Sequence, residues 1–160
     1  GFPRPLGARK RVWTTPNGKA NFTVPKSLEN RLSVPKDVYQ LVTLRSDGQF
    51  NTTVYGLDDR FRGVFGGRDV VLMNTADMAR LGLDMGDTVR LVTDYDDGVR
   101  RELGGLQVLP FGIPQGAIAS YYPECNVLIP LSHHAQGSKV PAAKSVPVRI
   151  VKETTAPAAE

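Results

Sequence analysis

The sequence predicts a mainly β fold with short helices, either a barrel or a sandwich. Its apolar runs are short, and turns rich in glycine and proline separate them. One segment, which follows Met73, carries both the start and the stop signals of a helix. The 160 residues are 41% hydrophobic, as in a globular domain. No apolar run approaches the ~18 residues that a membrane-spanning helix needs.

Residues 1–36 are predicted to form a basic extended connector. They hold eight Lys/Arg against one acid, a net charge of +7, whereas residues 37–160 hold twelve against fifteen, a net charge of −3. A basic arm can bind nucleic acid or anionic lipid, but such charge is more often simply solvated. The alternation around Phe22–Val24 predicts a short strand. Because the first residue is not methionine, we expect a piece of a longer protein.

Residues 37–151 are predicted to form the β domain. The nearly continuous apolar run 38–45 predicts a buried first strand. Residues 46–69 follow as a long polar loop with five glycines, which we expect to be functional and mobile, with a short strand at 52–55. The apolar run Val70–Met73 predicts the next strand.

A short helix is expected after this strand. Asn74 or Thr75 is its predicted N-cap, Asp77 lies in its first turn, and Gly82 stands just past its end. Met78 and Leu81 would face the core. Further strands are predicted at 88–93, 99–103, 106–109, 117–122, 127–129 and 146–151, with Asp97-Gly98 closing a hairpin between the first two. Residues 152–160 are predicted to be a frayed tail. No internal repeat is recognisable.

The chain carries no recognisable catalytic or metal-ligating set. It lacks the glycine-rich phosphate-binding motifs, the Gly-x-Ser-x-Gly elbow and the His-Glu-x-x-His zinc motif. The single cysteine, Cys125, can form no internal disulfide and builds no metal site alone. A lone cysteine mildly favours a reducing compartment, so we expect a cytoplasmic protein.

One candidate ligand-binding segment follows the first strand. A guanidinium that can form a bidentate fork on phosphate is followed by neutral hydroxyl and amide groups. The candidates are Arg45, Ser46, Gln49, Asn51 and Thr52. The alternative is a polar surface loop with a few turn hydrogen bonds, in which Arg45 pairs with an acid such as Asp47 or Asp94.

A second candidate segment is 121–128, where two tyrosines offer flat surfaces for a heterocycle and Asn126 follows. The alternative is that one tyrosine packs in the core and Asn126 caps a turn. Asn74 and Asp77 are weaker candidates, since an N-cap and its N3 partner occupy the same positions.

An ordered series of short patterns runs through nearly the whole chain. The patterns are Thr-Pro-x-Gly-Lys-Ala-x-Phe at 15–22, Leu-x-Thr-x-Arg at 41–45, Gln-x-Asn-Thr-Thr at 49–53, Asp-Arg-x-Arg-Gly at 59–63, Val-Leu-Met-Asn-x-x-Asp at 71–77, Gly-x-x-x-Gly-Asp-x-Val at 82–89, Pro-x-Gly at 114–116, Tyr-Tyr-Pro-x-x-Asn-x-Leu at 121–128 and Pro-x-x-Lys at 141–144. In this order they resemble the C-terminal molybdopterin-dinucleotide-binding domain of molybdenum oxidoreductases. The resemblance is closest to the formate-dehydrogenase-like alpha subunits. The stretch Arg11–Phe22 resembles the connector that precedes that domain.

The resemblance implies a double-psi β-barrel that holds bis-molybdopterin guanine dinucleotide against upstream domains of the same subunit. It implies that Arg45–Thr52 reach pterin and phosphate groups, and that Tyr122, Asn126 and Lys144 line the pterin side. Asn74 and Asp77 would lie at the next corner, and Arg60 and Arg62 would face neighbouring domains. The parent would perform two-electron redox chemistry at molybdenum and could dock on other redox subunits. Its metal ligand, and any iron–sulfur cluster, would lie upstream.

The alternative function is a small β-barrel that binds nucleic acid through its basic arm. Such a module needs cations interleaved with exposed aromatic side chains. The net negative charge of residues 37–160 argues against it, and so does the scarcity of aromatic residues in the arm, where Trp13 and Phe22 accompany the cations.

Overall fold

The computed structural model describes residues 1–24 and 35–153. The chain divides into two compact units, Gly1–Ser33 and Val34–Glu160. In the first unit, the described residues form one 3-10 helix, η1 (Ala8–Lys10), and turns. The predicted strand at Phe22–Val24 is wrong, since neither residue pairs with a described strand and their side chains are 99% and 81% exposed. The predicted tail lies outside the described residues beyond Glu153.

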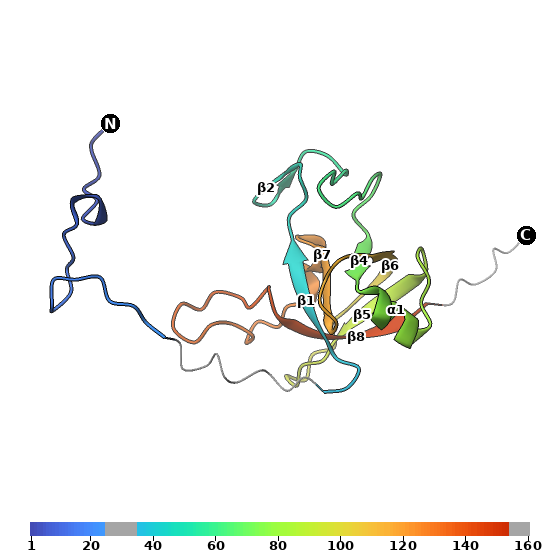
Figure 1. Ribbon diagram of the computed structural model, residues 1–160. Helices are drawn as coiled ribbons and strands as arrows, with labels where there is room; N and C mark the ends of the chain where they lie inside the picture. Colours follow the sequence, from blue (N-terminus) through green and yellow to red (C-terminus); the bar gives the residue numbers. More distant parts are fainter. Residues whose placement is uncertain (25–34, 154–160) are drawn as a thin grey trace, which may run out of the picture. The chain divides into compact units, whose positions relative to one another are not determined.

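The second unit is a closed barrel of six strands in the order β1-β7-β4-β6-β5-β8 (Figure 1). A separate two-stranded ribbon and two short helical elements complete it. The barrel strands are β1 (Tyr39–Leu44), β4 (Val70–Met73), β5 (Thr88–Thr93), β6 (Glu102–Pro110), β7 (Ala117–Tyr121) and β8 (Val146–Lys152). The ribbon is β2 (Gln49–Phe50) with β3 (Thr53–Val54), and the helical elements are α1 (Thr75–Leu81) and the 3-10 helix η3 (Glu124–Leu128).

The strand pairing has an internal twofold pattern. β1 is parallel to β7 and antiparallel to β8, while β6 is parallel to β4 and antiparallel to β5. The remaining pairs, β4 with β7 and β5 with β8, are antiparallel. Exchanging the first three barrel strands for the last three therefore leaves every pairing unchanged. Two interleaved halves with crossed parallel pairs make this a double-psi β-barrel, and closure leaves no free edge among these six strands.

Two apolar clusters explain why some strands are buried on both faces. The barrel interior holds the inward residues of every strand, such as Leu41, Val71 and Leu91, each fully buried. Val70 and Leu72 point to the other face of β4 and pack in a second cluster with Val64, Ala119 and Tyr121. All four residues of β4 are consequently buried, as its continuous apolar run predicts.

The predicted helix is confirmed as α1, which Asn74 caps. Its side-chain oxygen accepts a hydrogen bond from the backbone N–H of Ala76 at 2.9 Å. Gly82 ends the helix in the left-handed conformation, with φ 63°, where glycine avoids the steric cost of a Cβ. Met78 is buried in the barrel core and Leu81 packs against it, so the helix faces the core as expected.

Two strand predictions are wrong. Residues 99–101 are not part of a strand, and residues 102–103 belong with 106–109 to one strand, β6, which continues through Gly104 and Gly105 with an irregular register against β5. Segment 127–129 is largely helical, because Cys125 and Leu128 are buried three residues apart while Val127 is 52% exposed. A spacing of three suits a 3-10 turn, whereas a strand would alternate.

Because the interior of the closed barrel is filled with side chains, removing one of them should lower the free energy of unfolding strongly. Replacing the fully buried Leu91 by alanine should lower the free energy of unfolding by roughly 2–5 kcal/mol. The matched variant Leu131→Ala, at a side chain that is 93% exposed, should change it by less than about 0.5 kcal/mol. Urea unfolding of both variants measures the difference, and equal losses would contradict this assignment of the core.

Candidate functional site

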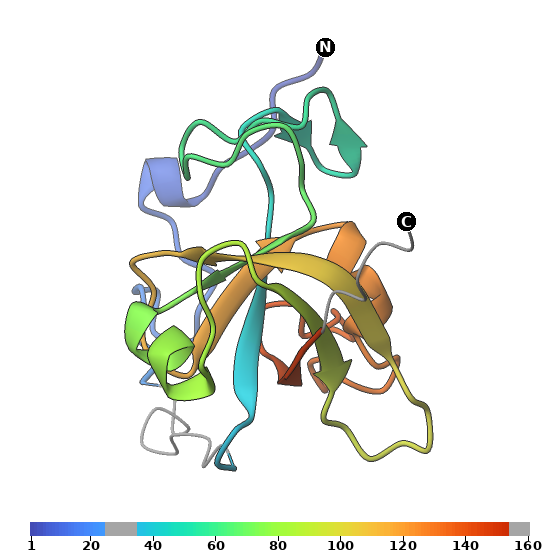
Figure 2. The same cartoon turned by 90° about the vertical axis from the view of Figure 1, so that its right-hand side faces the viewer.

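Strand direction decides which candidate residues can meet. Because β1 and β7 are parallel, Arg45 and Tyr122 leave the barrel at the same end. β4 is antiparallel to β7, so Asn74 leaves at the opposite end. Figure 2 shows this separation, with loop 46–69 above the barrel and α1 at its lower left.

An open cavity of about 440 Å³ lies at the β1/β7 end. It brings together five of the ten predicted site residues, which are Arg45, Asn51, Tyr122, Asn126 and Lys144. The rest of its lining is Thr43, Leu44, Ile129, Val140, Pro141 and Ala143. The described residues of this lining therefore include two cations and no carboxylate, alongside amide groups and one aromatic ring.

The cavity has an uncompensated positive charge. The Lys144 ammonium donates a hydrogen bond to the carbonyl of Thr43. Burial lowers the pKa of Lys144, and the positive charge of Arg45 lowers that pKa further. Within the described part of the chain, no carboxylate pairs with Arg45, because Asp47 pairs with Arg60 at 2.7 Å and Asp94 pairs with Arg149 at 3.0 Å. Neither pairing that was considered for Arg45 is present, so its guanidinium is available to an anion.

Ser46 and Gln49 lie near the cavity, but their side chains form hydrogen bonds to other residues of the protein. The Ser46 hydroxyl accepts a hydrogen bond from Arg68, and the Gln49 carbonyl oxygen accepts another at 3.0 Å. The Gln49 amide donates to the carbonyls of Asn51 and Tyr122 at 2.8 and 2.5 Å. Thr52 is exposed and does not line the cavity.

Arg68 is the residue that the sequence analysis missed. It is only 4% exposed, and its Nε lies 2.6 Å from the carboxylate of Glu124. Its guanidinium also stacks over the ring of Tyr121, 4.7 Å from the ring centre. The signal available in the sequence was the acid inside the Tyr-Tyr-Pro-Glu segment, because a partly buried acid, such as Glu124 with 26% of its side chain exposed, is stabilised by a cationic partner.

Asn74 and Asp77 bind backbone at the opposite end. The Asn74 amide donates to the carbonyl of Ile113 at 2.7 Å, and its oxygen caps α1. The buried Asp77 carboxylate accepts from the backbone N–H of Gly116 at 2.7 Å and pairs with Arg80 at 3.3 Å. Asn74 thus makes half of the expected capping box, while Asp77 ties the helix to the loop before β7.

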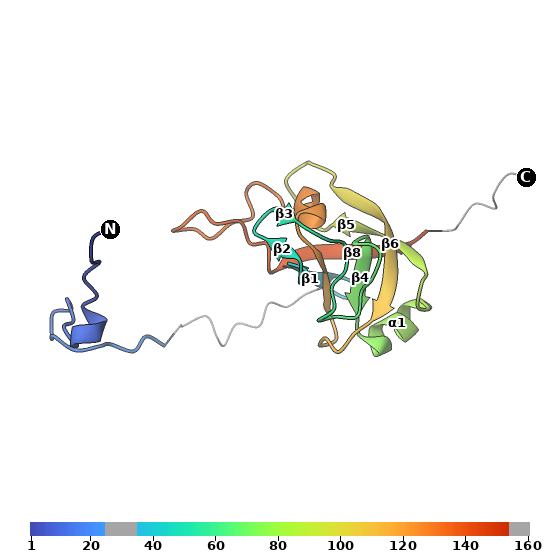
Figure 3. The same ribbon diagram turned by 90° about the horizontal axis from the view of Figure 1, so that it is seen from above.

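Loop 46–69 has more anchors than its sequence suggested. Asp59 is fully buried, and its carboxylate accepts hydrogen bonds from Arg62 at 2.5 Å and from the Tyr121 hydroxyl at 2.9 Å. Burial by itself would raise the pKa of Asp59, but these hydrogen bonds outweigh it and hold the pKa below its ordinary value. Val64, 3% exposed, packs under the loop. Figures 1 and 3 together place the β2–β3 ribbon over this end of the barrel.

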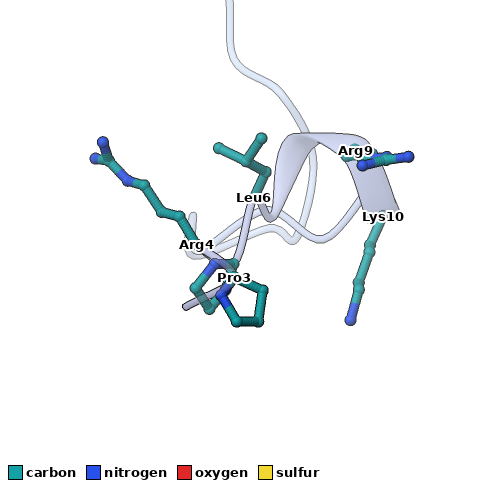
Figure 4. Close-up of a pocket in the computed structure, with 6 residues that line it drawn as sticks. Pro3, Arg4, Leu6, Arg9 and Lys10 are labelled. Atoms are coloured by element: carbon teal, nitrogen blue, oxygen red, sulfur yellow. The ribbon is translucent and has the colours of Figure 1, made fainter. Parts of the chain in front are cut away.

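The basic arm has a separate depression of about 470 Å³, lined by Pro3, Arg4, Pro5, Leu6, Arg9 and Lys10. Figure 4 shows Arg4 on one side of the segment, with Arg9 and Lys10 on the other. These cations do not converge on one point, and the lining offers no aromatic surface. The depression therefore does not form an anion site that could compete with the barrel cavity.

The fold defines the chain as a double-psi β-barrel domain. Residues 39–147, from the start of β1 into β8, match the protein family described as "Molydopterin dinucleotide binding domain". The chain belongs to this family of molybdopterin-dinucleotide-binding domains.

Its relatives are much longer proteins. An uncharacterized oxidoreductase of Mycobacterium tuberculosis strain H37Rv is 45% identical over 159 residues, which cover 94% of this chain and 20% of that protein. Protein YdeP of Escherichia coli K12 is 39% identical over 153 residues, with the same coverage of 94% and 20%. The chain thus spans about a fifth of the length of the curated relatives it matches. A rationally designed protein, apDPBB_sym_79, aligns with a TM-score of 0.41 at 19% identity, over 72% of this chain and 97% of that one.

Within residues 1–24 and 35–153, no helix combines the length and the apolar character required to cross a membrane. The same ranges contain no group of three or more His, Cys, Asp or Glu side chains that could hold a metal ion.

The depressed pKa of Asp59 predicts a pH-dependent contribution to stability. The folded-state pKa lies below the ordinary value of 3.8, so the contribution is present above that value and is lost as the pH falls through the folded pKa. Asp59→Asn should lower the free energy of unfolding at pH 7 by roughly 1–3 kcal/mol. Urea unfolding between pH 7 and pH 3 should show this difference shrinking. A difference that is constant with pH would show that the ionised carboxylate is not responsible.

Asp77 is predicted to be a structural residue. Asp77→Ala leaves the partly buried N–H of Gly116 without its acceptor, which should lower the free energy of unfolding by roughly 1–3 kcal/mol. Because Asp77 lies at the end of the barrel away from the cavity, the folded full-length variant should contain as much molybdopterin dinucleotide as the wild type. Thermal unfolding and ligand analysis of the purified variant measure the two effects. Loss of ligand without loss of stability would place a site at α1 instead.

Proposed function

We propose that this chain is the domain of a longer, formate-dehydrogenase-like molybdenum oxidoreductase that holds bis-molybdopterin guanine dinucleotide. The observation that carries the proposal is the cavity at the β1/β7 end. Arg45 and Lys144 line it without a compensating carboxylate among the described lining residues, and Tyr122, Asn51 and Asn126 complete the set.

The chemistry of these side chains fits an anionic, heteroatom-rich ligand. The Arg45 guanidinium can form two parallel hydrogen bonds to one phosphate, and the Lys144 ammonium adds a second positive charge. The amides of Asn51 and Asn126 can donate to and accept from the edge of a heterocycle, and Tyr122 offers an aromatic face. We assign pterin and phosphate groups of the cofactor to this cavity.

The proposed role of the chain is to bind and orient the cofactor. When bound, the cofactor would supply two-electron redox chemistry at molybdenum, while the protein provides position and electrostatics. An open cavity of about 440 Å³ encloses only part of a dinucleotide, so other domains would cover the rest. The relatives' length supports this arrangement, since the chain covers 20% of each. We further propose docking on other redox subunits and, because its single cysteine is free, a cytoplasmic location.

Arg45→Ala tests the site. In the full-length protein it should lower the molybdenum and guanine nucleotide content, because a charge-assisted hydrogen bond contributes roughly 1.5–3 kcal/mol. In the 160-residue chain it should change the free energy of unfolding by less than about 1 kcal/mol, because Arg45 is exposed and pairs with no described carboxylate.

The matched control is Arg100→Ala, an exposed arginine that does not line the cavity. It should leave both the cofactor content and the melting temperature unchanged. Full metal loading of the Arg45→Ala protein, together with a large fall in its melting temperature, would show that Arg45 is a structural residue and that the site lies elsewhere.

A further inference from the structure

Arg68 binds two segments that belong to different parts of the chain. Its Nη1 donates to the hydroxyl of Ser46 and its Nη2 donates to Gln49 at 3.0 Å, both in the segment after β1. Its Nη2 also donates to the carbonyl of Tyr122 at 2.8 Å, and its Nε to Glu124 at 2.6 Å, both in the turn after β7. One guanidinium therefore joins the two chain segments that leave the barrel at the cavity end.

Both segments contribute residues to the lining of the cavity, and the residues of each segment are called a wall below. Arg45 and Asn51 flank the first set of Arg68 contacts, while Tyr122 and Asn126 flank the second. Gln49 reinforces the connection, because its amide donates to the carbonyls of both Asn51 and Tyr122. Arg68 itself does not line the cavity. Its influence on a ligand must therefore act through the residues that it holds.

Burial makes this connection rigid. Arg68, Ser46 and Gln49 are 4%, 6% and 7% exposed, so water can replace few of the hydrogen bonds between them. Arg68 holds the pKa of Glu124 below its ordinary value, although burial of that carboxyl acts in the opposite direction. The ring of Tyr121 covers one face of the guanidinium. A lysine would keep the charge but lose the planar set of donors that reaches both segments.

We propose that Arg68 is the positioning residue of the cofactor site. It sets the separation between the Arg45–Asn51 wall and the Tyr122–Asn126 wall, so that both walls contact the ligand without rearrangement. This inference rests on the proposed function. Preorganisation of this kind raises affinity by removing the cost of ordering the site when the ligand binds.

The test measures cofactor retention in the full-length protein. Molybdenum and guanine nucleotide content are followed with time after dilution, at a temperature well below the melting temperature of each variant. Arg68→Lys should lose cofactor about tenfold faster than the wild type, the change expected when a site must be reordered at each binding event. The control is Arg90→Lys, because Arg90 likewise joins two segments of the chain, through the carboxylates of Glu102 and Glu153, but lies outside the cavity lining. It should release cofactor at the wild-type rate.

A double variant separates positioning from general destabilisation. Because placing Arg45 is part of what Arg68 does, the R68K substitution should accelerate cofactor loss less in the R45A background than in the wild type, where it acts about tenfold. A purely structural role would instead make the two effects multiply. Should Arg68→Lys fail to fold, Ser46→Ala and Glu124→Gln each remove one partner of Arg68 and should still accelerate release.

The outcomes separate the two proposals. A wild-type protein that contains neither molybdenum nor guanine nucleotide would overturn the proposed function, and the role of Arg68 with it. A loaded wild type whose Arg68→Lys variant keeps its cofactor equally long would overturn the positioning role alone. Multiplying effects in R45A/R68K, or unchanged release in folded Ser46→Ala and Glu124→Gln variants, would also overturn it.

Discussion

The parallel pairing of β1 with β7 is the constraint on which the rest of the structure depends. Strands that run in the same direction end on the same side, so Leu44 and Tyr121 deliver their following residues to one end of the barrel. Connections between parallel strands must be long, and here the chain passes through β4, α1, β5 and β6 before it returns. Arg68 then joins the two exits in space although they lie far apart in sequence.

The elements that depend on neighbouring residues could be predicted from the sequence. The helix α1 is one of them, because the Asn74 cap begins it and the left-handed Gly82 ends it. The prediction failed where pairing between distant strands decides the extent of an element. The segments on either side of Gly104 and Gly105 were predicted as separate strands, but pairing with β5 on both sides of these glycines makes β6 one strand. The internal twofold pattern was equally invisible, because it resides in which strands pair and not in similar residues.

The candidate site could be predicted in part for the same reason. Polar groups after a strand mark an end of the barrel, and Arg45 and Tyr122 do line one cavity, but the sequence does not reveal which strands end on the same side. Asn74 and Asp77 follow a strand in the same way and lie at the other end. Ser46 and Gln49 lie next to this cavity in the chain, yet a buried arginine more than fifteen residues away occupies their side chains. Their partner became recognisable only when the barrel closed.

The twofold pattern means that this barrel has two equivalent mouths that differ in what covers them. The connection from β6 to β7, residues 111–116, corresponds to the connection from β1 to β4, residues 45–69. The short one lies close to α1, and Asn74 and Asp77 bind its backbone at Ile113 and Gly116. The long one has room for the β2–β3 ribbon, and its residues Arg45 and Asn51 line the open cavity. The difference in connection length thus gives the two ends of one symmetric scaffold different surfaces, while the strand pairing between them is the same.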